Sequence, residues 1–229
     1  MAVSVEKRKE LFQACQMLNE LGIFDEQGHF SARPESGADT FIINEHSSPE
    51  TTGLQDFVEC QVDGLDFPEG VPSETVFHAK IYEHRDDVNA ICHNHSPYAT
   101  VVSSIGLEMR PVHQVGVIQR RPVTIYEDYH TADGTLITTK KEAEDVVEAL
   151  GTDQALALRG HGPIVVGNSI THAAMTSVKL EYNSRLEYMQ AAVGDPWYLS
   201  EELVEGNLQF AFDEYKMMKP LDYYLFNSN

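Results

Sequence analysis

The segment 88–95, Val-Asn-Ala-Ile-Cys-His-Asn-His, constrains the fold of this chain more than any other part of the sequence. Its apolar and β-branched residues predict a strand, whose alternation places Ile91, His93 and His95 on one face. A Ser-Pro pair follows directly, and because proline suits the first turn of a helix, the strand is expected to end there. The two imidazoles therefore lie at the carboxyl end of a strand, where open α/β sheets place their ligand sites.

A third histidine, His161, stands between two glycines and between two apolar runs, 155–158 and 164–166. A lone histidine is most often structural, and a His-x-His pair by itself is not specific for a metal. Three neutral imidazoles on one ion, however, leave at least one coordination position of zinc, iron or manganese open. Such an open position distinguishes a catalytic metal site from a closed structural one, because substrate or water can occupy it.

Ser73 and Glu74 precede an amphipathic segment, 78–82, and two interpretations of this pair are open. Ser73 could be a helix N-cap and Glu74 a first-turn acid that favours the helix dipole. Beside a cation, Glu74 could instead transfer the proton that C–C bond cleavage needs. Because three histidines accompany it, we favour the acid/base role.

Length and charge limit the classes of protein. The 229 residues, 42% of them hydrophobic, are enough for one sizeable core, so we expect a single domain over 1–229. The net charge of −20 argues against nucleic acid and anionic membranes as partners, because Lys and Arg dominate such binding. The sequence shows no Cys-x-x-Cys pair, no secretory segment and no apolar run of the roughly 18 residues that cross a bilayer. These features predict a soluble protein of the reducing cytoplasm.

Periodicity and capping residues predict further elements. A helix is expected over 5–21, and short strands over 30–33, 40–44 and 57–62. Thr139 and Glu142 form a capping box for a helix that ends at Gly151, and Ser169 can cap a long helix that runs to Val193.

Several motifs, in their order and spacing, closely resemble the class II aldolase/adducin family. They are Ser-Glu-Thr at 73–75, His-Ala-Lys-Ile-Tyr at 78–82, Val-Asn-Ala at 88–90, His-Asn-His-Ser-Pro-Tyr at 93–98 and Arg-Gly-His-Gly-Pro-Ile-Val-Val-Gly at 159–167. The resemblance extends over about 18–194. It implies that His93, His95 and His161 bind the metal and that Glu74 is an additional ligand or the acid/base.

The same resemblance implies an architecture and an assembly. We expect an α/β fold with three layers, α/β/α, around a central mixed, largely antiparallel sheet. We also expect a homotetramer with active sites at subunit interfaces. The tail, about 205–229, interleaves methionines and tyrosines, which suits packing on a neighbouring subunit.

The chain departs from the sugar-phosphate-cleaving members of this family in the residues expected to meet the substrate. Those enzymes typically hold phosphate with a Gly-Asn, a Ser-Gly and a Ser-Ser pair. Here His29 stands in place of the Asn, and Ser47 and Ser48 stand in place of Ser-Gly. A proline precedes Ser73 where the second serine pair is expected. We therefore expect these four residues to contact an unphosphorylated acid.

Two further residues are candidates for proton transfer. His113 lies in a segment, Arg-Pro-Val-His-Gln, that resembles one near the metal cavity in decarboxylase-like members of the family. Its alternative role is that of a hydrogen-bonded histidine at a strand end. Tyr129 lies in a polar stretch that could cover the pocket, where aromatic residues serve more often in packing than in chemistry. Either side chain could protonate the carbanion left by cleavage.

These observations predict a divalent-metal-dependent lyase that cleaves a C–C bond of a small hydroxy or keto acid. Retro-aldol cleavage and decarboxylation would both pass through a metal-stabilised enolate. We expect one metal ion per chain, Zn²⁺ first, with Fe²⁺, Mn²⁺ or Co²⁺ as alternatives. The same three histidines could hold Fe(II) in a non-haem oxygenase acting on a hydroxy acid. A non-catalytic, adducin-like interaction protein is the third alternative, and the intact cluster argues against it.

Overall fold

The computed structural model of the chain describes residues 4–46, 53–130 and 134–211. Its helices are α1 (Val5–Glu20), α2 (Thr75–His84), α3 (Pro97–Ser104), the 3-10 turn η1 (Gln114–Gly116), α4 (Lys140–Leu150), α5 (Ile170–Ala191) and α6 (Glu201–Ala211). Its strands are β1 (His29–Ala32), β2 (Thr40–Asn44), β3 (Phe57–Gln61), β4 (Ala90–His93), β5 (Thr124–Tyr126), β6 (Ala155–Leu158) and β7 (Gly162–Gly167). The expected first helix and first three strands are confirmed, each within one residue at either end.

The described strands form one sheet in the order β3-β2-β1-β4-β7-β6-β5. Neighbouring strands run antiparallel except β5 and β6, which are parallel. The sheet is therefore mixed and largely antiparallel, as expected. Strand β4 lies at its centre, and His93 pairs with His29 of β1 on one side and with Ile164 of β7 on the other.

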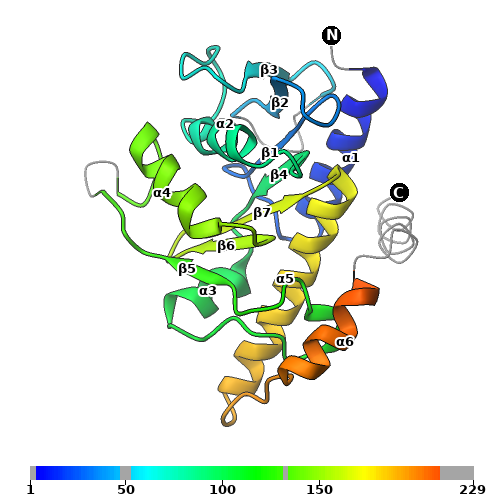
Figure 1. The fold of residues 1–229 in the computed structure, drawn as a ribbon, viewed down its shortest axis with the longest axis vertical. Coiled ribbons are helices and arrows are strands. Elements are labelled where there is room, and N and C mark those ends of the chain that lie inside the picture. The colour runs from blue at the N-terminus through cyan, green and yellow to red at the C-terminus, as the bar shows by residue number, and fades with distance from the viewer. Residues whose placement is uncertain (1–3, 47–52, 131–133, 212–229) are drawn as a thin grey trace.

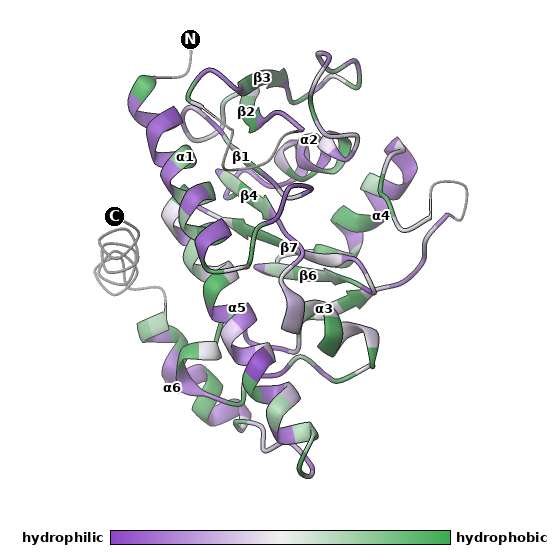
Figure 2. Cartoon of the chain, turned by 180° about the vertical axis from the view of Figure 1, so that it is seen from behind, coloured by the Kyte–Doolittle hydropathy of each residue, from purple (hydrophilic) through white to green (hydrophobic). Residues whose placement is uncertain are grey.

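Helices cover both faces of this sheet (Figure 1). On one face, α1 and α5 pack in a cluster that includes Phe30 and Cys92, and α3 joins them further along the sheet. On the opposite face, α2 and α4 pack in a second cluster with Ile91 and Ile164. Figure 2 shows the central strands coloured mainly as hydrophobic between these helices. The expected α/β/α layering is confirmed.

The alternation expected along β4 is present, although the strand is shorter than predicted. Ala90 and Cys92 belong to the core beneath α1 and α5, whereas Ile91 packs beneath α2 and α4. His93 is two residues beyond Ile91, so its side chain faces the α2 layer. The strand ends at His93, and His95 lies in the connection to α3. The prediction of a strand through 95 is corrected accordingly.

Helix α3 begins at the predicted Ser-Pro pair, but a residue from another helix caps it. Ser96 occupies the N-cap position without a side-chain capping hydrogen bond. The carboxylate of Glu181, in α5, instead accepts hydrogen bonds from the backbone N–H groups of Tyr98 at 3.1 Å and Ala99 at 3.0 Å. A carboxylate at this end also favours the helix dipole. This contact ties the segment that carries the His-x-His pair to α5.

The other predicted helix starts are confirmed. Thr139 and Glu142 form a reciprocal capping box at α4, and the Ser169 hydroxyl accepts a hydrogen bond from the backbone of His172 at α5. Of the tail predicted to pack on a neighbouring subunit, 205–211 belong to α6 and 212–229 lie outside the described residues. None of the described helices combines the length and the apolar character needed to cross a membrane.

A buried carboxylate lies between α5 and the segment that precedes α6. Glu187 is 0% exposed and accepts a hydrogen bond from the Tyr198 hydroxyl at 2.9 Å. Burial raises the pKa of Glu187 to about 7, against the opposing effect of the Tyr198 hydrogen bond. The folded protein therefore keeps a proton on Glu187 at pH values where the unfolded chain has released it.

Stability should consequently fall as the pH rises through the pKa of folded Glu187, since the folded state binds the extra proton. We expect Glu187→Gln to gain stability relative to the wild type between about pH 5 and about pH 8.5. Thermal unfolding at both pH values measures the change, at about 2–4 °C in Tm for each kcal/mol. Glu202→Gln, at an exposed position of α6, is the control that should show no such trend. An equal difference at the two pH values would contradict the prediction.

Candidate metal centre

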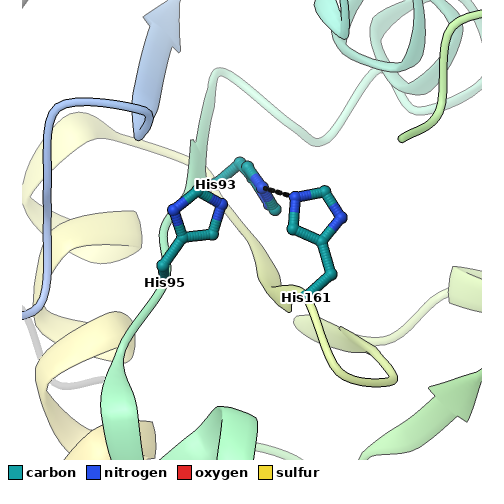
Figure 3. A group of neighbouring side chains, drawn as sticks. All are labelled: His93, His95 and His161. Carbon is teal, nitrogen blue, oxygen red and sulfur yellow. Dashed lines mark hydrogen bonds between the residues drawn. The ribbon is translucent and has the colours of Figure 1, made fainter. Parts of the chain in front are cut away.

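Three histidines from two segments of the chain converge on one point (Figure 3). His93 ends β4, His95 lies two residues further on, and His161 lies in the turn between β6 and β7. Each offers one ring nitrogen, and these three atoms lie within 4.8 Å of one another. Because β4 and β7 are paired neighbours, the turn before β7 lies beside the end of β4. The trio singled out in the sequence is therefore brought together by the sheet.

The glycines on either side of His161 allow this close approach. Gly160 has φ +72°, a left-handed conformation that residues with a side chain rarely adopt. A Cβ atom on Gly162 would lie 2.1 Å from the backbone oxygen of Asn94. Any side chain at this position would push His161 away from the segment that carries His95.

The Nδ1 atom of each imidazole faces an oxygen that can only accept a hydrogen bond. These oxygens are the Pro163 carbonyl at 3.2 Å from His93, the Asp25 carboxylate at 2.9 Å from His95 and the Thr135 carbonyl at 3.0 Å from His161. Each Nδ1 therefore carries the hydrogen, and each Nε2 presents its lone pair to the cluster. Outer hydrogen bonds of this kind orient histidine ligands in metal sites.

A divalent cation bound by these lone pairs would remove the repulsion between them. The Nε2 atoms of His93 and His161 lie 3.2 Å apart, and two lone pairs at that distance repel. The buried Nε2 of His95 has no hydrogen-bond partner among the described residues. Burial lowers the pKa of His93 and of His161, which favours the neutral form that binds a metal. The residues present therefore fit a metal ion.

Glu74 lies at the edge of this cluster. Its Oε2 atom is 3.6 Å from the Nε2 atom of His161 and 3.8 Å from that of His93, and its Oε1 atom accepts a hydrogen bond from the Ile137 N–H at 2.8 Å. Burial raises the pKa of Glu74. Glu74, and not Ser73, is the N-cap residue of α2, and its carboxylate makes no capping hydrogen bond. The predicted N-cap at Ser73 is therefore wrong by one residue, whereas Glu74 does lie at the N-terminus of α2.

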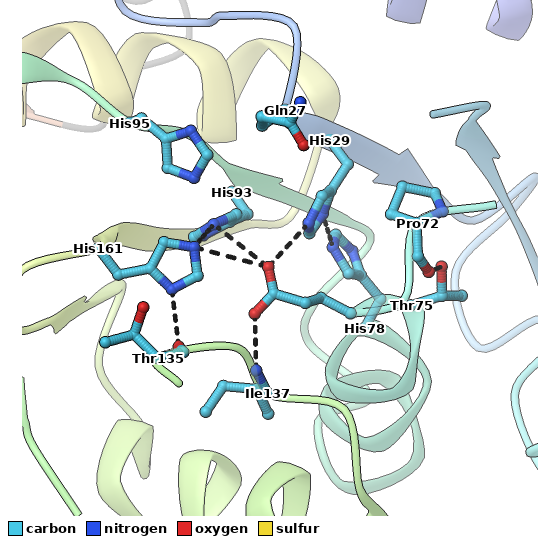
Figure 4. A network of polar contacts seen from close by, with 12 residues as sticks. Gln27, His29, Pro72, Thr75, His78, His93, His95, Thr135, Ile137 and His161 are labelled. Atoms are coloured by element: carbon cyan, nitrogen blue, oxygen red, sulfur yellow. Dashed lines mark hydrogen bonds and ion pairs between the residues drawn. The ribbon is translucent and has the colours of Figure 1, made fainter. Parts of the chain in front are cut away.

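His29 and His78 extend the cluster away from the three-histidine centre (Figure 4). The Nε2 atom of His29 is 3.6 Å from Oε2 of Glu74, and its Nδ1 atom is 2.7 Å from Nε2 of His78. One ligand atom from each of His29, Glu74 and His93 also lies within 4.8 Å of the other two. The structure thus places a fourth histidine beside the predicted trio.

A cavity of about 430 Å³ opens onto the cluster. The lining includes the predicted residues His29, Ser73, Glu74, His95 and His161. Ser47 and Ser48 lie outside the described residues, so their predicted contacts are not placed. The cavity is large enough for a small acid, and polar side chains surround it.

The two remaining candidates occupy different positions. The Tyr129 hydroxyl donates a hydrogen bond to the Arg159 carbonyl at 3.0 Å, and burial and then the charge of Glu74 raise the pKa of Tyr129. His113 accepts a hydrogen bond from the Val115 N–H and lines another cavity, between η1, α5 and α6. Their roles as proton donors stay predictions.

Reasoning from the sequence missed several residues that shape the site. Asp25 and the Thr135 carbonyl orient two of the imidazoles, and no motif marks either one. His78 had a signal, because it is four residues beyond Glu74 and therefore lies on the same face of α2. That His78 contacts His29 of β1 could not be predicted without knowing the strand register.

Comparisons with known proteins point to one family. The family model described as Class II Aldolase and Adducin N-terminal domain matches residues 9–188. The 5-deoxy-D-ribulose 1-phosphate aldolase of Bacillus thuringiensis is 30% identical over 166 residues, 72% of this chain and 75% of that protein. The 3,4-dihydroxyphthalate decarboxylase of Arthrobacter keyseri is 25% identical over 207 residues, 82% of this chain and 79% of that protein.

A solved structure shows the same fold. The aldolase II superfamily protein from Pseudomonas syringae superposes with a TM-score of 0.82 at 21% identity, covering 100% of this chain and 94% of that one. The match spans the sheet and both helical layers described above. With the family model matching most of its length, the chain belongs to the class II aldolase and adducin family.

Proposed function

We propose that the protein is a divalent-metal-dependent lyase that cleaves a C–C bond of a small hydroxy or keto acid. The observation that carries this proposal is the orientation of three imidazoles whose Nε2 lone pairs converge beside a buried carboxylate. His93, His95 and His161 would hold the ion, Zn²⁺ in the first instance, and leave a position open for substrate. The aldolase and decarboxylase relatives support the reaction class.

The alternatives have less support. The relatives named above are an aldolase and a decarboxylase, and the oxygenase alternative gains nothing from them. An interaction protein would have no need of three imidazoles with aligned tautomers around a buried Glu74. The lyase therefore accounts for more of the site.

Glu74 is the residue proposed to move the proton. Its Oε2 atom lies within 3.8 Å of the Nε2 atoms of His93 and His161, Glu74 lines the cavity, and the Ile137 N–H holds the other carboxylate oxygen in place. A raised pKa brings a carboxyl group closer to the pH at which it can both give and accept a proton. A bound cation supplies electrostatic stabilisation of the negative charge left by C–C cleavage. His113 and Tyr129 remain the proposed donors to the carbanion.

The proposed substrate is an unphosphorylated acid. Ser73 and His29 line the cavity beside the cluster, and both stand where sugar-phosphate aldolases are expected to carry phosphate-binding residues. Ser47 and Ser48 are proposed to complete these contacts. A homotetramer, with 205–229 packed on a neighbouring subunit, is the proposed assembly.

The metal assignment predicts that His93→Ala and His161→Ala lose zinc, because each removes one of three ligands. Elemental analysis of protein purified without chelators measures the metal content per chain. His84→Ala, at an exposed position of α2, should retain the metal. Zinc retained by His161→Ala would rule out this site, and stoichiometric iron lost in the same variant would favour the oxygenase.

The acid/base assignment predicts that Glu74→Gln keeps the metal and loses turnover by about 10²- to 10⁴-fold. The assay is cleavage by the wild type and the variant of a panel of hydroxy acids, keto acids and aldols, with detection of aldehyde and carbon dioxide. Full activity in Glu74→Gln would contradict the role. No cleavage of any compound by the zinc-loaded wild type would count against the lyase.

The outer hydrogen bond to His95 predicts that Asp25→Asn weakens zinc affinity by about 10- to 100-fold. The variant removes the charge that stabilises the Nδ1–H tautomer, and competition with a chromophoric chelator measures the affinity. Glu26→Gln makes the same charge change at the adjacent exposed residue and should leave the affinity unchanged. Equal losses of zinc affinity in the two variants would show that the effect comes from net charge and not from the hydrogen bond between Asp25 and His95.

A further inference from the structure

A chain of buried polar side chains leads from the core to the candidate site. The Tyr82 hydroxyl lies 2.9 Å from Oγ of Ser31, and this Oγ lies 2.7 Å from Nδ1 of His78. The Nε2 atom of His78 then lies 2.7 Å from Nδ1 of His29. Tyr82, Ser31 and His78 are each 0% exposed, and His29 is 1% exposed. Burying four polar groups is costly unless every hydrogen among them finds an acceptor.

The local structure explains why these residues line up. His29 and Ser31 are two residues apart on β1 and point to the same face of the sheet. His78 and Tyr82 are four residues apart on α2 and share the face of the helix that packs on that strand. Figure 4 shows the His29 and His78 rings in contact, with His29 directed toward the histidine cluster.

The positions of the hydrogens in this chain follow from counting them. The rings of His29 and His78 are buried, and the Glu74 carboxylate stays 3.6 Å from Nε2 of His29, beyond hydrogen-bond distance, so we take each ring as neutral. Each of the four side chains then carries one hydrogen, and the contacts between them need one hydrogen apiece. Tyr82 lies at the end of the chain away from the cavity. Among the described residues, Oγ of Ser31 is the acceptor within reach of its hydroxyl hydrogen.

One arrangement satisfies the whole chain. Tyr82 donates to Ser31, Ser31 donates to Nδ1 of His78, and Nε2–H of His78 donates to Nδ1 of His29. The reverse direction leaves the buried Tyr82 hydrogen without an acceptor. If Ser31 instead accepts from both Tyr82 and Nδ1–H of His78, its own hydrogen has no acceptor among the described residues, and every other mixed arrangement brings two lone pairs or two hydrogens together across one contact. The hydrogen of His29 is therefore on Nε2, the atom directed toward the carboxylate of Glu74.

We propose that Tyr82, Ser31 and His78 fix the tautomer of His29, so that its Nε2–H donates a hydrogen bond to a carboxylate oxygen of the metal-bound acid. His29 then determines specificity for an acid and is not a fourth metal ligand, because an Nε2 that carries hydrogen has no lone pair for the ion. The nearest carboxylate oxygen, Oε2 of Glu74, is 3.6 Å away, beyond hydrogen-bond distance. Among the described residues the buried Nε2 of His29 has no other hydrogen-bond partner, and His29 is one of the residues that line the cavity.

The first test is the tautomer itself. Zinc-loaded protein labelled with ¹⁵N in histidine is examined by NMR, and the His29 signals are identified by their loss in His29→Gln. We expect the hydrogen of His29 on Nε2 in the wild type. A hydrogen on Nδ1, with a bare Nε2, would overturn the proposal.

The second test asks whether His29 donates a hydrogen bond to the acid or binds the zinc ion. His29→Gln can place an amide N–H near the position of Nε2, whereas His29→Leu cannot. We expect both variants to keep the wild-type zinc content. Calorimetry with glycolate, a small hydroxy acid, should give an affinity about tenfold or more weaker for His29→Leu and near the wild-type value for His29→Gln. Zinc lost from His29→Leu would overturn the proposal, as would equal glycolate affinities in the two variants.

The third test concerns the positioning residues. Ser31→Ala removes the acceptor of Tyr82 without touching the cavity, so a second set of His29 ring signals and weaker glycolate binding are expected. Ser103→Ala, a buried serine in α3, should change neither measurement. An unchanged His29 tautomer and unchanged affinity in folded Ser31→Ala would show that the chain has only a structural role.

The choice of an acid as ligand rests on the proposed lyase function, but these measurements need no turnover. Zinc-loaded wild type that fails to bind glycolate would overturn the substrate class. Absence of cleavage across the panel of acids and aldols would count against the lyase and would leave the tautomer and the zinc content as they are.

Discussion

The pairing of β4 with β1 and β7 is the interaction on which the site depends. It places His93 in register with His29 on one side and with Ile164 on the other. The turn before β7 then brings His161 to within 3.2 Å of His93, measured between their Nε2 atoms. A slip of one residue in this register would turn His93 toward α1 and α5, because side chains alternate along a strand. The three imidazoles would then no longer lie together.

The layer between the sheet and α2 combines hydrophobic packing with polar chemistry. Most of this layer is apolar, and the Glu74 carboxylate and the imidazoles of His29, His78 and His93 are buried beside it. Burial of polar groups there costs little stability where they are hydrogen-bonded to one another, as Tyr82 and Ser31 are. Among the described residues, the atoms left without a hydrogen-bond partner include Nε2 of His95 and Nε2 of His29, and both of these residues line the cavity. Unpaired buried groups of this kind mark the place where a ligand is needed.

Elements with strong local signals were predictable. The capping box of Thr139 and Glu142, the start of α5 at Ser169 and the alternation along β4 all depend on residues close together in the chain. Predictions failed where a distant residue took over a local role, as when Glu181 replaced Ser96 as the cap of α3. No local pattern could show which cavity His113 lines, and its role as a proton donor stays a prediction.

The sequence by itself determined which residues the site has available and, through the family motifs, the fold that carries them. His-Asn-His after a strand and His161 between two glycines are local patterns with few alternative uses. Only the tertiary structure decided how those side chains are oriented. The hydrogen on each Nδ1, the place of Asp25 beside His95 and the direction of the chain from Tyr82 to His29 depend on contacts between segments far apart in the sequence. Hydrogen-bond partners, which fix a tautomer, come from packing and strand register, and neither can be read from residue order.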